Sequence, residues 1–172
     1  KYFSPQVYQS IFSGELDVQI KTSRKRLTIF FSDIIGFSEL TERLEPEILT
    51  ELVTSYLTEM TRIAMKHGGT VDKYIGDAIM VFFGAPQSKG TIQDAISCAS
   101  MAICMKDALK PLRLSWKKTG ISQPLDIRIG IHTDTCTVGN FGSNDRLDYT
   151  TIGNGVNLAS RLESSAESNQ IL

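Results

Sequence analysis

Two aspartates, Asp33 and Asp77, stand at the edges of apolar runs with strand-forming composition. Asp33 follows the run 28–31, and Asp77 lies between a tight turn at 75–76 and the run 78–83. An ionised carboxylate beside a β-rich core is costly to desolvate unless a positive group meets it, and no Lys or Arg lies within three residues of Asp33. If the fold brings the two carboxylates together, hard divalent cations would offset their repulsion. Two such ions serve one common route to phosphoryl or nucleotidyl transfer.

The residues next to Asp33 could complete such a site. The backbone carbonyl of Ile34 is a further hard oxygen donor of the kind that divalent cations accept. Gly36 and Gly76 are small enough to admit a bulky ligand, and Gly36 and Phe37 are candidates for contact with it. The alternative is structural, because a single Asp at the end of a strand usually caps the strand or belongs to a turn.

Three further side chains could bind a nucleotide. Lys73 lies on the other arm of the hairpin that contains Asp77, and it could donate to a ring nitrogen or a phosphate. Asn157 and Arg161 are four residues apart, so a helix would place the amide and the guanidinium on one face as a clamp for phosphate and sugar. Otherwise, Lys73 is a solvated edge charge and the other two are surface polar residues.

The bulk composition excludes several classes of protein. The chain has 172 residues and a net charge of −1, which indicates one domain and no nucleic-acid partner bound by overall charge. No apolar run reaches the ~20 residues of a membrane span, so we expect a cytoplasmic location and no direct membrane contact from this segment. The three cysteines, Cys98, Cys104 and Cys136, are odd in number and lack metal-site spacing, so we interpret them as reduced core or near-core thiols.

Hydrophobic periodicity predicts strands and helices in the order β-α-α-β-β-α-β-β-α. This order favours an α+β fold with a ferredoxin-like β-α-β-β-α-β core and a mainly antiparallel sheet covered by helices. The helix that Thr91 is expected to cap should end near Pro111 and bury one face, made of Ile92, Ala95, Ile96, Ala99, Ala102, Ile103 and Leu109. The predicted elements are a short helix at 5–12, a strand at 27–31, a short helical stretch after Gly36, a helix from 46 to 67, a hairpin of 70–74 with 78–83, the helix from 91, a strand at 125–131, a second arm at 136–141, a turn at 144–146 and a helix at 155–167.

Five ordered segments resemble the catalytic domain of class III nucleotidyl cyclases, and the chain looks most like bacterial adenylyl cyclases. The similarity runs from about residue 25 to the end of the chain, and five motifs in order at suitable intervals are highly specific. The matching segments are FFSDIIGFSELTE at 30–42, GGTVDKYIGDAIMVFFGAP at 68–86, IRIGIH at 127–132, VGNFGS at 138–143 and YTTIGNGVNLASRLE at 149–163.

The resemblance implies roles for the residues around the metal ions and the base. Asp33 and Asp77 match the two metal-binding aspartates, and Ile34 matches the backbone ligand. Lys73 matches a purine-selecting position that is usually Lys in adenylyl and Glu in guanylyl cyclases, so the implied substrate is ATP. A Lys can donate to N1 of adenine but clashes with the N–H at that edge of guanine. Thr150 matches the second purine-selecting position, where its hydroxyl can accept from the adenine amino group.

The remaining matches imply the reaction. Asn157 matches the residue that orients the ribose, and Arg161 matches the residue that stabilises charge on the α-phosphate. The ribose 3′-oxygen would attack the α-phosphorus of ATP with two divalent cations, Mg²⁺ or Mn²⁺, to give 3′,5′-cyclic AMP and pyrophosphate. Family members are head-to-tail homodimers, so Asp33 and Asp77 of one subunit would face the nucleotide-binding side chains of the other.

The resemblance also implies a division of the chain. Residues 1–25 match a lead-in from an upstream regulatory domain, and residues 26–172 are expected to form a cyclase catalytic domain that is C-terminally incomplete. A Lys that binds the β- and γ-phosphates normally lies some tens of residues beyond the position of Arg161. One position departs from the family, because Asp134 stands where Gly is usual, and this matters if the backbone there needs a positive φ.

Three alternatives remain open. A guanylyl cyclase is disfavoured by Lys73, and a diguanylate cyclase is disfavoured because the chain has no Gly-Gly-Asp/Glu-Glu-Phe turn. A catalytically silent cyclase-like domain, used for dimerisation or regulation, is disfavoured because the two aspartates, the asparagine and the arginine are all retained. Arg128 and Arg146 could bear on phosphate or on an interface, but no role is assigned to them.

Overall fold

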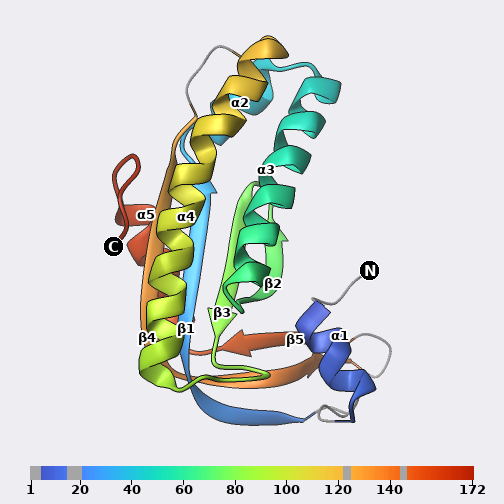
Figure 1. The fold of residues 1–172 in the computed structure, drawn as a ribbon, viewed down its shortest axis with the longest axis vertical. Coiled ribbons are helices and arrows are strands. Elements are labelled where there is room, and N and C mark those ends of the chain that lie inside the picture. The colour runs from blue at the N-terminus through green and yellow to red at the C-terminus, as the bar shows by residue number, and fades with distance from the viewer. Residues whose placement is uncertain (1–4, 15–20, 122–124, 144–146) are drawn as a thin grey trace.

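Five strands form one antiparallel sheet in the order β2-β3-β1-β4-β5, with helices on both faces (Figure 1). The computed structural model describes residues 5–14, 21–121, 125–143 and 147–172. The predicted β-α-β-β-α-β core is present, because β2, β3, β1 and β4 are adjacent in the sheet, and the α+β fold is confirmed. The elements are α1 (Pro5–Phe12), β1 (Thr22–Ile34), α2 (Phe37–Arg43), α3 (Pro46–Lys66), β2 (Thr70–Ile75), β3 (Ala78–Phe83), α4 (Thr91–Lys118), β4 (Ile127–Gly142), β5 (Leu147–Ile152) and α5 (Asn154–Ser165).

The two faces of the sheet carry different helices and different cores. In Figure 1, α3 and α4 lie in front of the sheet and α5 lies behind it. Side chains alternate along β1, so Phe30 joins the larger core under α3 and α4, whereas Leu27, Ile29 and Phe31 join the smaller core with Ala159 of α5. This alternation also turns Asp33 toward the side of α5.

The central strands β1 and β4 are longer than predicted. β1 extends over 13 residues and pairs with β4 along its whole length, from Thr22 opposite Gly139 to Ile34 opposite Ile127. The predicted strands at 125–131 and 136–141 are therefore one strand, because β1 holds the intervening residues in extended conformation. The hairpin partner of its second half is β5, which was not predicted, and the turn expected at 144–146 lies outside the described residues.

The sheet curls until its two edge strands meet. β5 pairs only with the second half of β4, residues 137–142, which extends beyond the part of β1 that pairs with β3. In Figure 1, β5 crosses at the lower end of the β2–β3 hairpin. As a result, the hydroxyl of Thr150 on β5 lies 2.6 Å from the carboxylate of Asp72 on β2, although these strands are at opposite ends of the strand order.

The buried face of α4 differs from the prediction. Ile92, Ile96 and Ile103 are 79%, 52% and 57% exposed, respectively, so this part of the expected face points to solvent, whereas Ala102 and Leu109 are buried as predicted. A second stripe with the same helical spacing is buried against the sheet and α3, because its flexible Met side chains fill the space there. Its members are Asp94, Cys98, Met101, Ala102, Met105, Leu109 and Trp116.

Three smaller expectations about α4 are also wrong. Gly90, not Thr91, is the N-cap residue, and the helix continues past Pro111 to Lys118. Cys98 is buried as expected, but Cys104 lies on the exposed side of the same helix. Both cysteine positions follow from the rotated burial of the helix.

Gly130 of β4 lets α5 lie directly on the sheet. A Cβ atom at this position would overlap the backbone oxygen of Ala159 and the backbone nitrogen of Glu163. Gly130→Ala is therefore expected to lower the free energy of unfolding by about 3 kcal/mol or more, because backbone atoms cannot move aside as a side chain can. Denaturant unfolding should show this loss beside the exposed control Ser100→Ala in α4; equal stability of the two variants would contradict the close contact.

Candidate active site

Asp33 at the end of β1 is paired with an arginine from the neighbouring strand. Arg128 lies directly opposite in the β1–β4 register, and its Nε and Nη2 each donate to one carboxylate oxygen of Asp33 at 2.8 Å. The sequence indicated no nearby positive group because this partner is 95 residues away along the chain. Arg128, to which no role was assigned, is thus a site residue that register alone reveals.

Glu163 of α5 shares the same guanidinium. Its Oε1 lies 2.7 Å from Nε of Arg128, and the residue is only 6% exposed. Burial, together with the adjacent Asp33 carboxylate, raises the pKa of Glu163 to about 7. One guanidinium faces two carboxylates here, so burial and the charge of Asp33 disfavour the ionised form of Glu163.

Glu163→Gln is expected to reduce the pH dependence of stability. The folded-state pKa of about 7 lies above the unfolded value of about 4.5, so this group's contribution is full below pH 4.5 and is lost as pH rises through 7. Without added metal and with a chelator present, the wild-type protein should lose about 2–3 kcal/mol relative to the variant between pH 5 and pH 8. Denaturant unfolding at both pH values measures this difference, and parallel losses in the two proteins would contradict it.

Asp77 lies beside the same end of β1. Its Oδ2 accepts a hydrogen bond of 2.7 Å from the backbone N–H of Ile34. Burial raises the pKa of Asp77, and the nearby charge of Asp33 adds to the shift. Gly36 adopts the left-handed conformation with φ 72° and leads into α2, which begins at Phe37. The structure therefore brings Asp33, Asp77 and Ile34 together at the turn end of the β2–β3 hairpin, with Gly36 and Phe37 adjacent in the chain.

The donor set at this end fits hard divalent cations. Two negatively charged carboxylates repel each other, and a cation that binds both of them offsets this repulsion. Oxygen ligands are also the type that Mg²⁺ and Mn²⁺ prefer. Among the described residues, no group of three or more His, Cys, Asp or Glu side chains is placed to hold a metal ion. A cation here would thus depend on the two aspartates and backbone or substrate oxygens.

The predicted base-binding residues form a second cluster. Thr150 donates its hydroxyl proton to Asp72 at 2.6 Å, and Nζ of Lys73 lies 3.5 Å from the other oxygen of that carboxylate. Asn157 and Arg161 are both exposed on α5, one helical turn apart, and none of the described residues forms a hydrogen bond or ion pair with their side chains. The site residues therefore lie in three places on one chain.

Comparisons of sequence and structure relate the chain to known proteins. The model of the adenylate and guanylate cyclase catalytic domain matches residues 19–172. The chain belongs to this cyclase family. It is 37% identical to an adenylate cyclase of Anabaena cylindrica over 168 residues, which is 94% of the chain but 32% of that protein. The structure of adenylyl cyclase CyaB from P. aeruginosa has a TM-score of 0.86 at 56% identity, over 88% of this chain and 78% of that one.

Guanylyl cyclases are also similar to this cyclase domain. The structure of guanylyl cyclase Cya2 has a TM-score of 0.84 at 37% identity, over 88% of this chain and 76% of that one. The family generally uses divalent metal ions and acts as a dimer on a nucleotide substrate. Family membership alone therefore leaves the choice of purine to individual residues.

The departure at Asp134 does not strain this cyclase domain. Among the described residues, Asn169 is the only residue other than glycine with a positive φ, so Asp134 adopts ordinary strand geometry. Its carboxylate accepts a hydrogen bond of 2.7 Å from the N–H of Thr135. The usual glycine is therefore not required by backbone conformation at this position.

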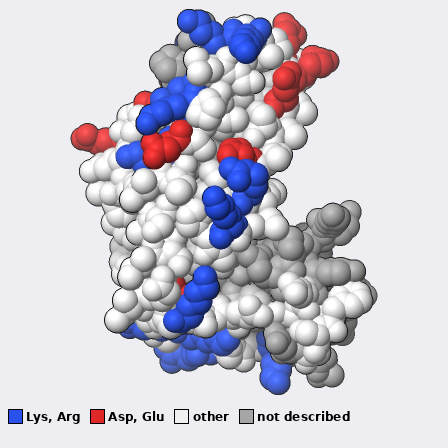
Figure 2. Space-filling model, in the orientation of Figure 1, with Lys and Arg blue, Asp and Glu red and all other residues white. Residues whose placement is uncertain are grey.

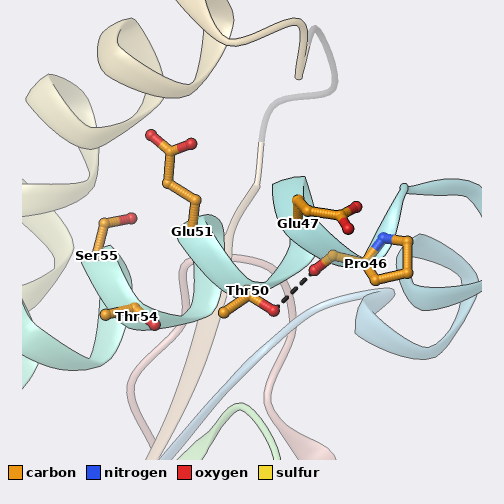
Figure 3. A pocket seen from close by; sticks show the side chains of 6 residues that line it. All are labelled: Pro46, Glu47, Thr50, Glu51, Thr54 and Ser55. Atoms are coloured by element: carbon orange, nitrogen blue, oxygen red, sulfur yellow. Dashed lines mark hydrogen bonds between the residues drawn. The ribbon is translucent and has the colours of Figure 1, made fainter.

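The surface hollows of the cyclase domain lie away from these clusters. A shallow hollow of about 600 Å³ runs beside the first turns of α3, where Thr50 donates to the carbonyl of Pro46 at 2.7 Å (Figure 3). A second hollow is lined by residues that include His67, Thr70 and Asp94, and neither hollow is lined by the predicted site side chains.

The visible face of the domain carries charges of both signs. On the visible face, Lys and Arg are spread along the whole length, and Asp and Glu lie mostly in the upper half (Figure 2). Within the described ranges, none of the helices has the length and apolar content to cross a bilayer. Because the net charge of the chain is only −1, binding of an anionic nucleotide depends on specific side chains.

Proposed function

We propose that this domain is an adenylyl cyclase, which converts ATP to 3′,5′-cyclic AMP and pyrophosphate. The cluster of Lys73 and Thr150 carries the proposal, because the ammonium can donate to N1 of adenine and the hydroxyl oxygen can accept from the adenine amino group. The similar proteins from Anabaena cylindrica, Rhizobium meliloti and P. aeruginosa that are named adenylate or adenylyl cyclases support this choice of base.

In the proposed reaction, Asp33, Asp77 and the carbonyl of Ile34 hold two divalent cations, Mg²⁺ or Mn²⁺. When bound, such cations lower the pKa of the ribose 3′-hydroxyl and neutralise charge on the triphosphate. Asn157 orients the ribose, and Arg161 stabilises the charge that develops on the α-phosphate. The 3′-oxygen forms a bond to the α-phosphorus, the bond to the β-phosphate oxygen breaks, and the hydroxyl proton passes to solvent.

The pairing of Asp33 with Arg128 sets a condition on this reaction. Both carboxylate oxygens of Asp33 accept from the guanidinium, so a cation would bind through the lone pairs that these two hydrogen bonds leave free. Glu163, 2.7 Å from Arg128, is an alternative partner for that guanidinium.

We further infer a head-to-tail homodimer in the cytoplasm, where ATP is found. The carboxylates of Asp33 and Asp77 lie at the turn end of the β2–β3 hairpin, whereas Lys73 lies in the middle of β2 opposite Met80, and Thr150 of β5 contacts the neighbouring Asp72. Twofold symmetry could place the first cluster of one subunit opposite the second cluster of its partner and would form two equal sites.

The chain spans 32% and 21% of the lengths of the Anabaena cylindrica and Rhizobium meliloti relatives. We infer from the family resemblance that residues 1–25 are a lead-in from an upstream regulatory domain and that residues 26–172 form the catalytic domain. The activity of the whole protein would then respond to a signal received outside the cyclase domain.

A substrate assay tests the proposed function against its alternatives. The full-length protein is incubated with ATP or GTP and with Mg²⁺ or Mn²⁺, and both cyclic nucleotides are measured. We expect cyclic AMP from ATP, with kcat/KM at least about 10-fold above that for GTP. Cyclic GMP as the main product would show a guanylyl cyclase, which the similarity to Cya2 makes the second candidate. No product under any condition would indicate the silent domain.

A further inference from the structure

The carboxylate of Asp72 is buried between the two residues proposed to read the purine. Its side chain is only 2% exposed, and it accepts the hydroxyl proton of Thr150 at 2.6 Å. The backbone N–H of Thr151 also donates to it, and Nζ of Lys73 lies 3.5 Å away. A buried carboxylate costs free energy unless such donors surround it, so these contacts hold the cluster in one arrangement.

A β-bulge explains why Asp72 and Lys73 reach the same cluster. Consecutive residues of a regular strand point to opposite faces of the sheet. The β2–β3 register shifts between Val71 and Lys73, so Asp72 is an extra residue without a partner on β3. Bulges of this kind redirect side chains and are common beside active sites. The curl of the sheet then brings Thr150 of β5 to the same carboxylate.

The direction of the hydrogen bond from Thr150 has a chemical consequence. A threonine hydroxyl can both donate and accept, so alone it does not separate an amino group from a carbonyl oxygen. Once its proton is donated to Asp72, the oxygen of Thr150 can only accept. It then matches the amino group at C6 of adenine and repels the carbonyl oxygen at C6 of guanine. Lys73, attracted to the same carboxylate, supplies the donor that adenine N1 requires.

We propose that Asp72 is a specificity-determining positioning residue, which fixes Thr150 as a hydrogen-bond acceptor and Lys73 as a donor so that the site selects adenine over guanine. Asp72 acts through these two residues and need not touch the nucleotide. This inference rests on the proposed cyclase function and adds a residue to its base-binding site.

Asp72→Asn tests the proposal with little change in size. The amide can donate to the oxygen of Thr150, which frees the hydroxyl proton to donate to guanine, and Lys73 loses its anionic neighbour. The ratio of kcat/KM for ATP to that for GTP should fall about 10- to 100-fold, mainly through KM. The control Asp107→Asn makes the same chemical change at an exposed position of α4 and should leave the ratio unchanged.

Thr150→Val provides a second route that leaves the carboxylate in place. It should lower the ATP-to-GTP ratio by a similar factor. Adding Asp72→Asn to it should lower the ratio by less than the product of the two single effects, because both variants remove the hydrogen bond between Thr150 and Asp72 and only the contact with Lys73 remains to be lost. An unchanged ratio in either single variant, or independent multiplication of the two effects, would overturn the role of Asp72. Either of these two outcomes would leave the proposed preference of the wild-type protein for ATP unaffected. A wild-type protein that forms no cyclic nucleotide would overturn the proposed function and this inference together.

Discussion

Asp77→Asn is expected to lower kcat for cyclic AMP formation about 10³-fold, while the domain remains folded. The amide keeps an oxygen that can accept from the N–H of Ile34, so the hairpin turn stays attached to β1. The substitution removes the negative charge that would hold a divalent cation. Loss of an electrostatic contact that stabilises a transition state typically lowers kcat by a factor of this size. Steady-state kinetics with Mn²⁺ and ATP measure the loss.

Stability provides the control for this variant. Burial raises the pKa of Asp77, so its charged form is disfavoured in the folded state, and a neutral amide should leave the free energy of unfolding equal or slightly higher. Asp107→Asn, exposed on α4, should leave both stability and kcat unchanged. Activity above about one tenth of wild type in a folded Asp77→Asn protein would remove this carboxylate from the mechanism.

Local patterns were sufficient to predict much of the scaffold. The helix from Pro46 and the β2–β3 hairpin follow from apolar spacing and from glycines at the ends, and both are confirmed. The proximity of Asp33 and Asp77 was expected for the same reason, since each ends or begins a strand at one edge of an apolar run. Their assignment as metal ligands stays a prediction.

Local sequence patterns could not predict the contacts that depend on the register between strands. Arg128 reaches Asp33 only because β1 and β4 pair over thirteen residues, and the partners are 95 residues apart. Asp72 reaches Thr150 only through a bulge and the curl of the whole sheet. Periodicity describes one segment at a time, so it cannot specify either pair.

The prediction of which face of α4 is buried failed for a different reason. The helix carries two apolar stripes, one with Ile92, Ile96 and Ile103 and one with Met and Cys side chains, and both have helical spacing. The β-branched stripe was more hydrophobic, but the shape of the space under the helix selected the flexible one. Tertiary packing thus decided between two faces that sequence alone leaves nearly equal.

The second large effect is recovery of activity when two inactive variants share a dimer. In a head-to-tail dimer, Asp77 of one subunit serves the same site as Asn157 of its partner. A heterodimer of Asp77→Asn and Asn157→Ala subunits therefore has one site with both changes and one site with neither. Each homodimer should be nearly inactive, and the heterodimer should recover about half of the wild-type activity, since one of two sites is intact.

This heterodimer is also the most direct test of the central claim, that metal-binding carboxylates of one subunit act on a nucleotide held by the other. Full-length subunits carrying different affinity tags are expressed together, and dimers with both tags are purified and assayed with ATP and Mn²⁺. The claim predicts cyclic AMP formation at about half the wild-type rate per dimer. A purified heterodimer no more active than the mean of the two variant homodimers would contradict it.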